Sequence, residues 1–159
     1  MKKAVIIILI IIFLSVTYWL VSPFWRTEKV SEGLPVISPS VPETNDEEKA
    51  ENEVIIVKSG MFTGFDRIHT GSGTASVLKI GDKSYIRFEE NFTVNNGPDL
   101  YVGLGENGKY IKGSELGKLK GNVGSQNYEL PAGVTTEDVK EVWIWCKAFS
   151  VPFAKAELN

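Results

Sequence analysis

The chain has 159 residues, room for one domain of ordinary size with further segments, and its 43% hydrophobic and 23% charged residues argue against wholesale disorder. The single Cys excludes an internal disulfide and any multi-cysteine zinc or iron–sulfur site. The single His excludes His-rich metal sites, so we predict no metal site, and the formal net charge is only −3.

The N-terminal segment is apolar. No charge occurs between Ala4 and Trp25, and Lys2 and Lys3 precede the run. The apolar stretch 4–21 would span roughly 27 Å as a helix, and it is longer than the ~7–15 residues of a signal-peptide core. We therefore expect an uncleaved transmembrane signal anchor over residues 1–25, inserted in a membrane through residues 4–21, with a cleaved signal peptide as the alternative. The expected location is single-pass, with the N-terminus cytoplasmic and the C-terminal domain extracytoplasmic.

Residues 26–53 have the composition of a spacer. They contain several prolines and end in the run 43–53, which holds six acidic residues and one Lys. Such a stretch cannot bury enough apolar surface to offset the entropy of ordering it. We predict a Pro-rich, acidic, disordered linker, and the acids lack the alternating spacing of a calcium-binding loop.

Residues 54–159 form the predicted folded domain. Runs of β-branched and aromatic residues alternate with Gly- and Asn-rich turn signals, and no amphipathic helix of three turns is visible. The expected strands are 54–57, 74–80, 84–88, 92–94, 100–104, 126–130, 139–149 and 151–158. This pattern predicts an all-β fold, an antiparallel β-sandwich preceded by one transmembrane helix and a disordered linker. Acidic and basic residues balance in this domain and no basic cluster occurs, so we do not expect nucleic acid as a partner.

The segment 139–149 has two different faces. In a strand, alternate residues share a face. One face would carry Val142, Ile144 and Cys146 and should point into the core. The other would carry Trp143 and Trp145, flanked by charged residues, as in a groove wall or a partly covered sheet surface.

The order and spacing of several motifs between about 57 and 158 resemble the DM-thirteen domain, also called the electron-transfer DM domain. The matching elements are Gly60 with Phe62, His69 ahead of Gly-Thr-Ala, Gly97-Pro98-Asp99-Leu100, Leu116 to Gly121, Gly124 to Pro131, and Val142 to Phe153. The resemblance implies an extracytoplasmic β-sandwich, in bacteria often attached to a membrane anchor. It also implies a function linked to electron transfer.

Cys146 corresponds to the cysteine for which this family has a proposed role, as a redox thiol or as a ligand to a group such as haem. The alternative is a structural cysteine, because a free Cys is among the most often buried residues and burial keeps a thiol inert. A lone thiol outside the cytoplasm is exposed to oxidation unless it is shielded or used.

His69, Trp143 and Trp145 are the candidate cofactor-binding residues. His69 would be a second ligand or a base toward Cys146, or would simply bond the local backbone. The two tryptophans would form a ligand platform or an electron conduit, or would be covered by a loop or a second sheet. The cofactor is unknown, since haem is compatible with the family but no haem-attachment Cys-x-x-Cys-His occurs.

Two functional hypotheses follow. In the first, the protein is a membrane-anchored, extracytoplasmic electron-transfer or redox accessory centred on Cys146, with a redox protein as partner. In the second, it is a cell-surface interaction module that binds a protein or glycan, and Cys146 is structural. We do not expect a stand-alone enzyme, because the titratable residues form no recognisable catalytic set.

Overall fold

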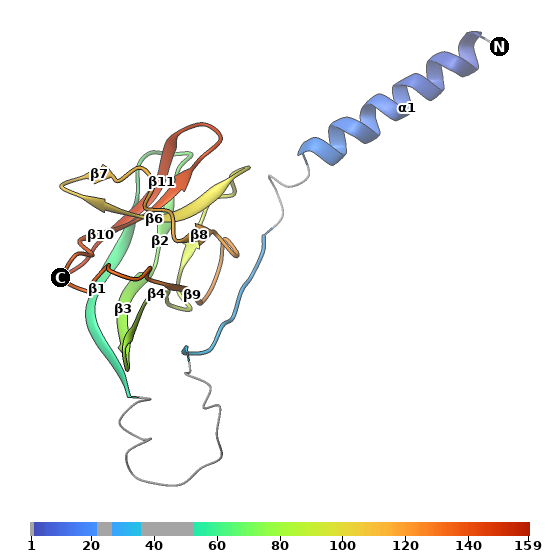
Figure 1. Cartoon of the computed structure of the whole chain (residues 1–159). Helices are drawn as coiled ribbons and strands as arrows, with labels where there is room; N and C mark the ends of the chain where they lie inside the picture. Colours follow the sequence, from blue (N-terminus) through green and yellow to red (C-terminus); the bar gives the residue numbers. More distant parts are fainter. Residues whose placement is uncertain (1, 22–26, 36–52) are drawn as a thin grey trace, which may run out of the picture.

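The computed structural model describes residues 2–21, 27–35 and 53–159 (Figure 1). Its elements are α1 (Lys2–Val21), β1 (Val54–Gly64), β2 (Gly71–Ser72), β3 (Thr74–Ile80), β4 (Lys83–Phe88), β5 (Thr93–Val94), β6 (Leu100–Glu106), β7 (Lys109–Tyr110), β8 (Gly117–Lys118), β9 (Gln126–Glu129), β10 (Glu141–Cys146) and β11 (Val151–Glu157). The strands of six or seven residues fall where the alternation of apolar and polar residues predicts them, whereas β1 continues to Gly64, well beyond the predicted 54–57. The two-residue strands β2, β7 and β8 were not predicted.

The N-terminal segment forms the predicted helix, α1, but not the predicted transmembrane helix. Within the described parts of the chain, no helix is long and apolar enough to cross a membrane. This finding corrects the predicted transmembrane helix and, with it, the membrane contact through residues 4–21. The predicted location of the C-terminal domain outside the cytoplasm stays a prediction.

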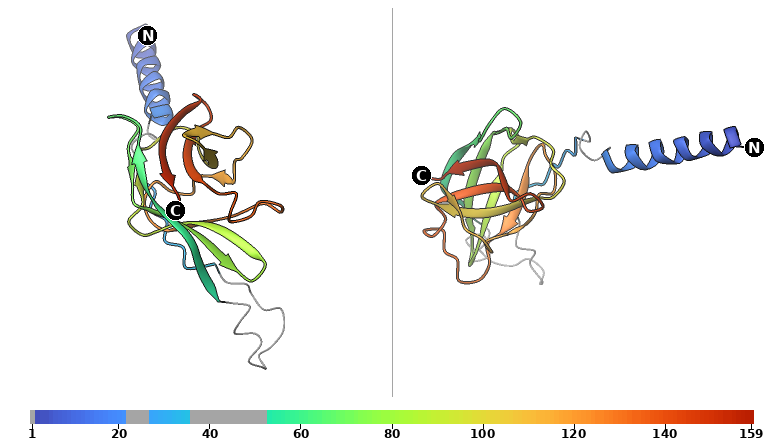
Figure 2. Two further views of the ribbon diagram at one scale, coloured as in Figure 1. Left: turned by 90° about the vertical axis from the view of Figure 1, so that its left-hand side faces the viewer. Right: turned by 90° about the horizontal axis from the view of Figure 1, so that it is seen from above.

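The β-strands form one antiparallel nine-stranded sheet, ordered β7-β6-β10-β11-β1-β3-β4-β9, with β8 paired to β6. β1 belongs to both halves of this sheet, because residues 54–61 pair with β3 and residues 62–64 pair with β11. The sheet bends along β1, so that the β3-β4-β9 half and the β6-β10-β11 half face each other (Figure 2). A small second sheet pairs β2 with β5. The prediction of an all-β antiparallel fold is confirmed.

The core lies between the two halves of the sheet. Val77, Ile86 and Phe88 come from one half, and Val142 and Ile144 come from the other, and all five are completely buried. Aromatic rings form a cluster in this core, where the rings of Phe62, Phe88, Phe92 and Tyr128 lie with centroids 4.5–5.4 Å apart in successive pairs.

Residues 27–35, which we call the N-terminal strap, are packed on the folded domain (Figure 1). Lys29 forms a parallel bridge with Val123, and the backbone N–H groups of Val30 and Glu32 donate to the carbonyls of Val123 and Ser125, each at 2.9 Å. The prediction of a disordered linker is therefore wrong for this stretch, because backbone pairing and the contacts of Glu32 with the domain offset the cost of ordering it. The other described residue of the predicted linker is Glu53, and residues 26 and 36–52 lie outside the described ones.

Candidate functional site

Cys146 lies at the end of β10 with its side chain in the core. It is a free cysteine with no exposed surface, and its strand neighbours are Leu100 on β6 and Val151 on β11. The alternation of side chains along β10 thus places Cys146 with Val142 and Ile144, as predicted. Thiol chemistry with a partner protein or with peroxide needs contact with the sulfur atom, and this closed arrangement does not provide it.

Trp143 and Trp145 lie on the opposite face of β10. The rings of Trp145 and Tyr110 stack in parallel, with centroids 4.6 Å apart and an interplanar angle of 2°. Tyr110 is 6.2 Å from Trp143, and Trp143 is 5.1 Å from Phe65. These four rings, which we call the aromatic row, join side chains from β10, β7 and the loop after β1.

Two rings of the aromatic row, those of Tyr110 and Trp143, lie against glycines of β6. A Cβ atom at Gly103 would lie 2.7 Å from the Tyr110 ring, and one at Gly105 would lie 2.1 Å from Nε1 of Trp143. Because β7 folds back over this face, Trp143 is only 3% exposed, whereas Trp145 remains partly exposed. The interpretation of this face as a partly covered sheet surface is therefore correct for both tryptophans.

Trp143 is hydrogen-bonded to a buried carboxylate. Its indole Nε1–H donates to Oε2 of Glu141 at 2.8 Å, and Glu141 is 5% exposed. The other carboxylate oxygen accepts from the backbone N–H of Gly108 at 2.7 Å and lies 3.6 Å from Nζ of Lys155. A hydrogen bond to Glu157, with Glu141 nearby, raises the pKa of Lys155, so this lysine stays charged beside the Trp143 ring.

Tyr110 is the hydroxyl-bearing member of the row. Its Oη atom is buried and has no hydrogen-bond partner among the described residues. Burial, and next the nearby Glu115 carboxylate, raise the pKa of Tyr110 to about 12. The phenol therefore stays protonated at neutral pH.

His69 lies in the loop between β1 and β2 and is held by Asp66. Nδ1 of His69 is 2.7 Å from Oδ2 of Asp66, whose other carboxylate oxygen accepts from the backbone N–H groups of Ile68 and His69. These hydrogen bonds lower the pKa of Asp66 to about 2. The ring of His69 meets Phe153 edge-on, with centroids 4.6 Å apart.

The structure brings the two tryptophans together but does not join His69 to Cys146. Among the described residues, no hydrogen bond or ring contact links these two side chains. Cys146 is completely buried in the hydrophobic core, and Nδ1 of His69 is paired with the Asp66 carboxylate. This pair does not fit a haem held between them, and we derive no step through such a group.

Sequence reasoning missed Tyr110 and Phe65 as neighbours of the tryptophans. The available signal was the pair Gly103 and Gly105 inside a strand, since glycine in a strand interior often marks a close approach by another group. What lies over those glycines depends on how β7 folds back, and β7 is only two residues long.

Comparison with known protein families gives a match. A family model described as Electron transfer DM13 matches residues 62–158. The match covers every strand from β2 to β11, including β6, β7 and β10 with the aromatic row, and it leaves out the N-terminal strap. No curated protein and no solved structure shows a significant match to the chain.

Proposed function

The chain belongs to the Electron transfer DM13 family, and from that membership we propose that it is an electron-transfer accessory domain that relays single electrons through the aromatic row. The hydrogen bond from Trp143 to the buried Glu141 carboxylate carries this proposal. A negative charge beside an indole N–H stabilises the oxidised, positively charged indole, more so where water is excluded.

The relay needs a one-electron oxidant and a one-electron reductant, each supplied by a redox partner protein. The oxidant removes one electron from the partly exposed Trp145. An electron from Trp143 then refills Trp145 across the stacked Tyr110 ring. The oxidised Trp143 keeps its proton in the hydrogen bond to Glu141, or passes that proton to the carboxylate, until the reductant returns one electron. No other atom is transferred.

Tyr110 serves as a bridge and is not oxidised itself. Loss of an electron from a phenol is favourable only when its proton has an acceptor. Burial, and next the nearby Glu115 carboxylate, raise the pKa of Tyr110, which opposes loss of the proton. The two indoles are therefore the redox-active members of the row.

Flash photolysis of the full chain with a photo-oxidised ruthenium complex, a one-electron oxidant, tests the relay. The background variant is Trp19→Phe with Trp25→Phe, which leaves only the two indoles of β10. In that background we expect a long-lived indole radical that Trp143→Phe abolishes, that forms several-fold more slowly in Trp145→Phe, and that decays several-fold faster in Glu141→Gln. Tyr85→Phe, which alters a tyrosine of β4, is the control and should change nothing. Radical yield and lifetime that are the same in all these variants would contradict the proposal.

The narrower hypothesis, a redox function centred on Cys146 itself, stays a prediction, and a thiol titration tests it. If Cys146 is the redox centre, its thiol reacts with a disulfide reagent in the native protein within seconds to minutes, and Cys146→Ser abolishes electron transfer. A thiol that reacts only in denaturant would remove Cys146 from the mechanism and leave the aromatic row.

The second candidate function, an interaction module with a structural cysteine, is favoured by the complete burial of Cys146. It predicts that the thiol is unreactive in the native protein and that none of the indole variants changes electron transfer. The photolysis and titration results together separate this function from the relay.

A further inference from the structure

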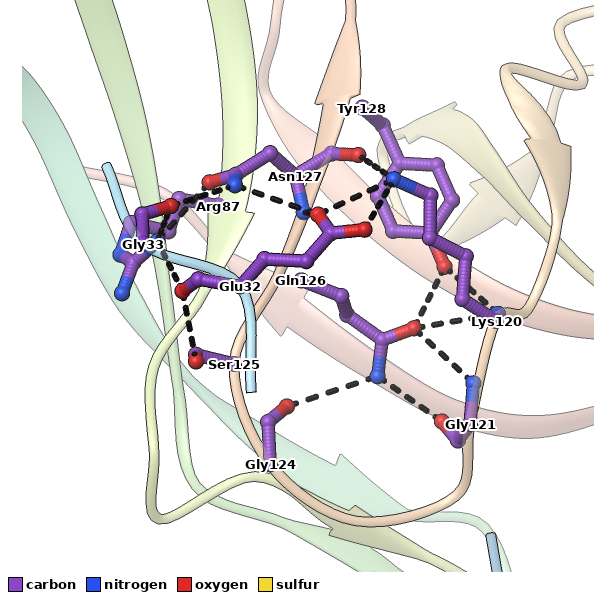
Figure 3. Close-up of polar contacts among 10 residues, drawn as sticks. All are labelled: Glu32, Gly33, Arg87, Lys120, Gly121, Gly124, Ser125, Gln126, Asn127 and Tyr128. Atoms are coloured by element: carbon purple, nitrogen blue, oxygen red, sulfur yellow. Dashed lines mark hydrogen bonds and ion pairs between the residues drawn. The ribbon is translucent and has the colours of Figure 1, made fainter. Parts of the chain in front are cut away.

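The N-terminal strap lies beside β9, against the loop 121–125 and polar side chains of β4 and β9 (Figure 3), and we call this contact surface of the domain the groove. The strap runs parallel to the loop. The backbone N–H groups of Val30 and Glu32 donate to Val123 and Ser125, and the N–H of Val123 donates to the carbonyl of Glu28 at 3.2 Å. This is the kind of backbone pairing by which a protein recognises an extended peptide, made here by a loop rather than by a sheet strand.

Two glycines leave room for the strap backbone. A Cβ atom at Gly121 would lie 2.6 Å from the carbonyl oxygen of Glu28, and one at Gly124 would lie 2.1 Å from that of Val30. Gly124 also has a φ of +95°, which favours glycine. The groove is thus shaped to admit a peptide backbone at close range.

Glu32 is the specific anchor of the strap. Nζ of Lys120 lies 2.7 and 3.0 Å from its two carboxylate oxygens, and Asn127 donates to Oε2 through its backbone N–H at 2.8 Å and its Nδ2 at 3.2 Å. Burial alone would raise the pKa of Glu32, but the hydrogen bonds from Lys120 and Asn127 hold it below its ordinary value. The groove therefore selects a carboxylate at this position.

Arg87 adds further hydrogen bonds to the strap. Its Nη1 donates to the strap carbonyls of Glu32 at 3.3 Å and Gly33 at 3.0 Å, and also to Asn127. Its Nε donates to the Glu89 carboxylate at 3.0 Å, and with the strap in place Arg87 is only 7% exposed. An extended segment that presents carbonyls here therefore gains hydrogen bonds from a charged donor.

The strap is far from its groove in the amino-acid sequence. Residues 36–52 separate it from β1, and seventeen residues can reach at most about 60 Å. That reach allows the same strap to enter the groove of a neighbouring copy. Exchange of an identical element between copies is a low-cost route to a dimer, because no new contact has to evolve.

We propose that the groove is a receptor for an extended segment carrying a glutamate at the position of Glu32, and that it takes this segment from a second copy of this chain, so that two copies exchange straps and form a dimer. In a dilute solution the chain's own strap has the advantage of an effective concentration in the millimolar range. Exchange therefore prevails where copies are concentrated or where the contact within one chain is weakened.

Two charge-reversal variants of the full chain, Glu32→Lys and Lys120→Glu, test the exchange. Within either variant the strap and groove carry like charges, so each alone should be a monomer whose strap trypsin cleaves rapidly after Lys29. In an equal mixture the strap of each variant meets a complementary groove on the other. We expect the mixture to form a dimer in analytical ultracentrifugation and to show at least tenfold slower cleavage after Lys29.

Mixtures that stay monomeric with rapidly cleaved straps would overturn the proposal. Nζ of Lys120 also donates to the carbonyl of Asn127, so Lys120→Glu could fail to fold. A second measurement tests the proposal without that variant. A labelled synthetic peptide of residues 27–35 should bind the Glu32→Lys chain saturably, and the same peptide with Lys at position 32 should not. Absence of peptide binding would overturn the receptor, and peptide binding without a dimer in the variant mixture would overturn the second copy as its source.

Discussion

Cys146 and His69, the two residues on which a sequence interpretation would place the chemistry, have different surroundings. Cys146 occupies a core position with no exposed surface, whereas His69 lies in a loop and is oriented by the Asp66 carboxylate. The surroundings of each residue therefore lead to a prediction about stability that does not depend on any redox function.

Two replacements of Cys146 distinguish the cost of lost packing from the cost of burying a polar group. In Cys146→Ser the hydroxyl is buried without a nearby polar partner and should cost about 1–3 kcal/mol of unfolding free energy. In Cys146→Ala only the sulfur is lost, and we expect a cost of about 1 kcal/mol, close to that of removing a single buried methylene group. Urea unfolding followed by tryptophan fluorescence measures both. A serine variant as stable as the wild type would show that a polar partner reaches this position.

Asp66 gives a pH-dependent signal. Because its pKa in the folded protein is about 2, below the ordinary 3.8, its contribution to loop stability is fully present above about pH 4 and is lost as the pH falls toward 2. An NMR titration of the Asp66 carboxyl carbon should have its midpoint at about 2. In His69→Asn the midpoint should move partway back toward 3.8, since the backbone N–H groups still donate to Asp66. An unchanged midpoint in that variant would mean that His69 does not hold the carboxylate.

At the scale of elements, glycines decide which segments approach the sheet. Gly103 and Gly105 admit the aromatic row over β6, and Gly121 and Gly124 admit the N-terminal strap beside β9. Both contacts join segments that sequence periodicity alone does not connect, and both depend on the absence of a Cβ atom.

Gly124→Ala should release the strap. Gly133→Ala is the matched control, because the two glycines have similar positive φ values, +95° and +89°, but nothing lies within 4 Å of a Cβ at Gly133. Both variants should lose about 1 kcal/mol from backbone strain. Only Gly124→Ala should speed tryptic cleavage after Lys29, by about tenfold or more. Equal cleavage in the two variants would show that the strap tolerates the added methyl group.

At the scale of the whole molecule, the location of the domain is the open prediction. If residues 54–159 lie outside the cytoplasm, an amine reagent that cannot cross membranes should label exposed lysines such as Lys118, which is 70% exposed, in intact cells. A cytoplasmic protein labelled only after lysis serves as the control. Labelling of the domain only after lysis would contradict the predicted location.

The sequence by itself determined the β-rich domain, most of its strands and the two faces of β10, because alternation of apolar and polar residues fixes which side chains face the core. It also indicated the family, since motif order and spacing survive without any knowledge of packing. Only the tertiary structure decided that Tyr110 stacks on Trp145, that Glu141 holds the indole of Trp143, and that residues 27–35 join the domain. These contacts bring together residues far apart in the chain, and their stability comes from backbone pairing and charge complementarity that local propensity does not report.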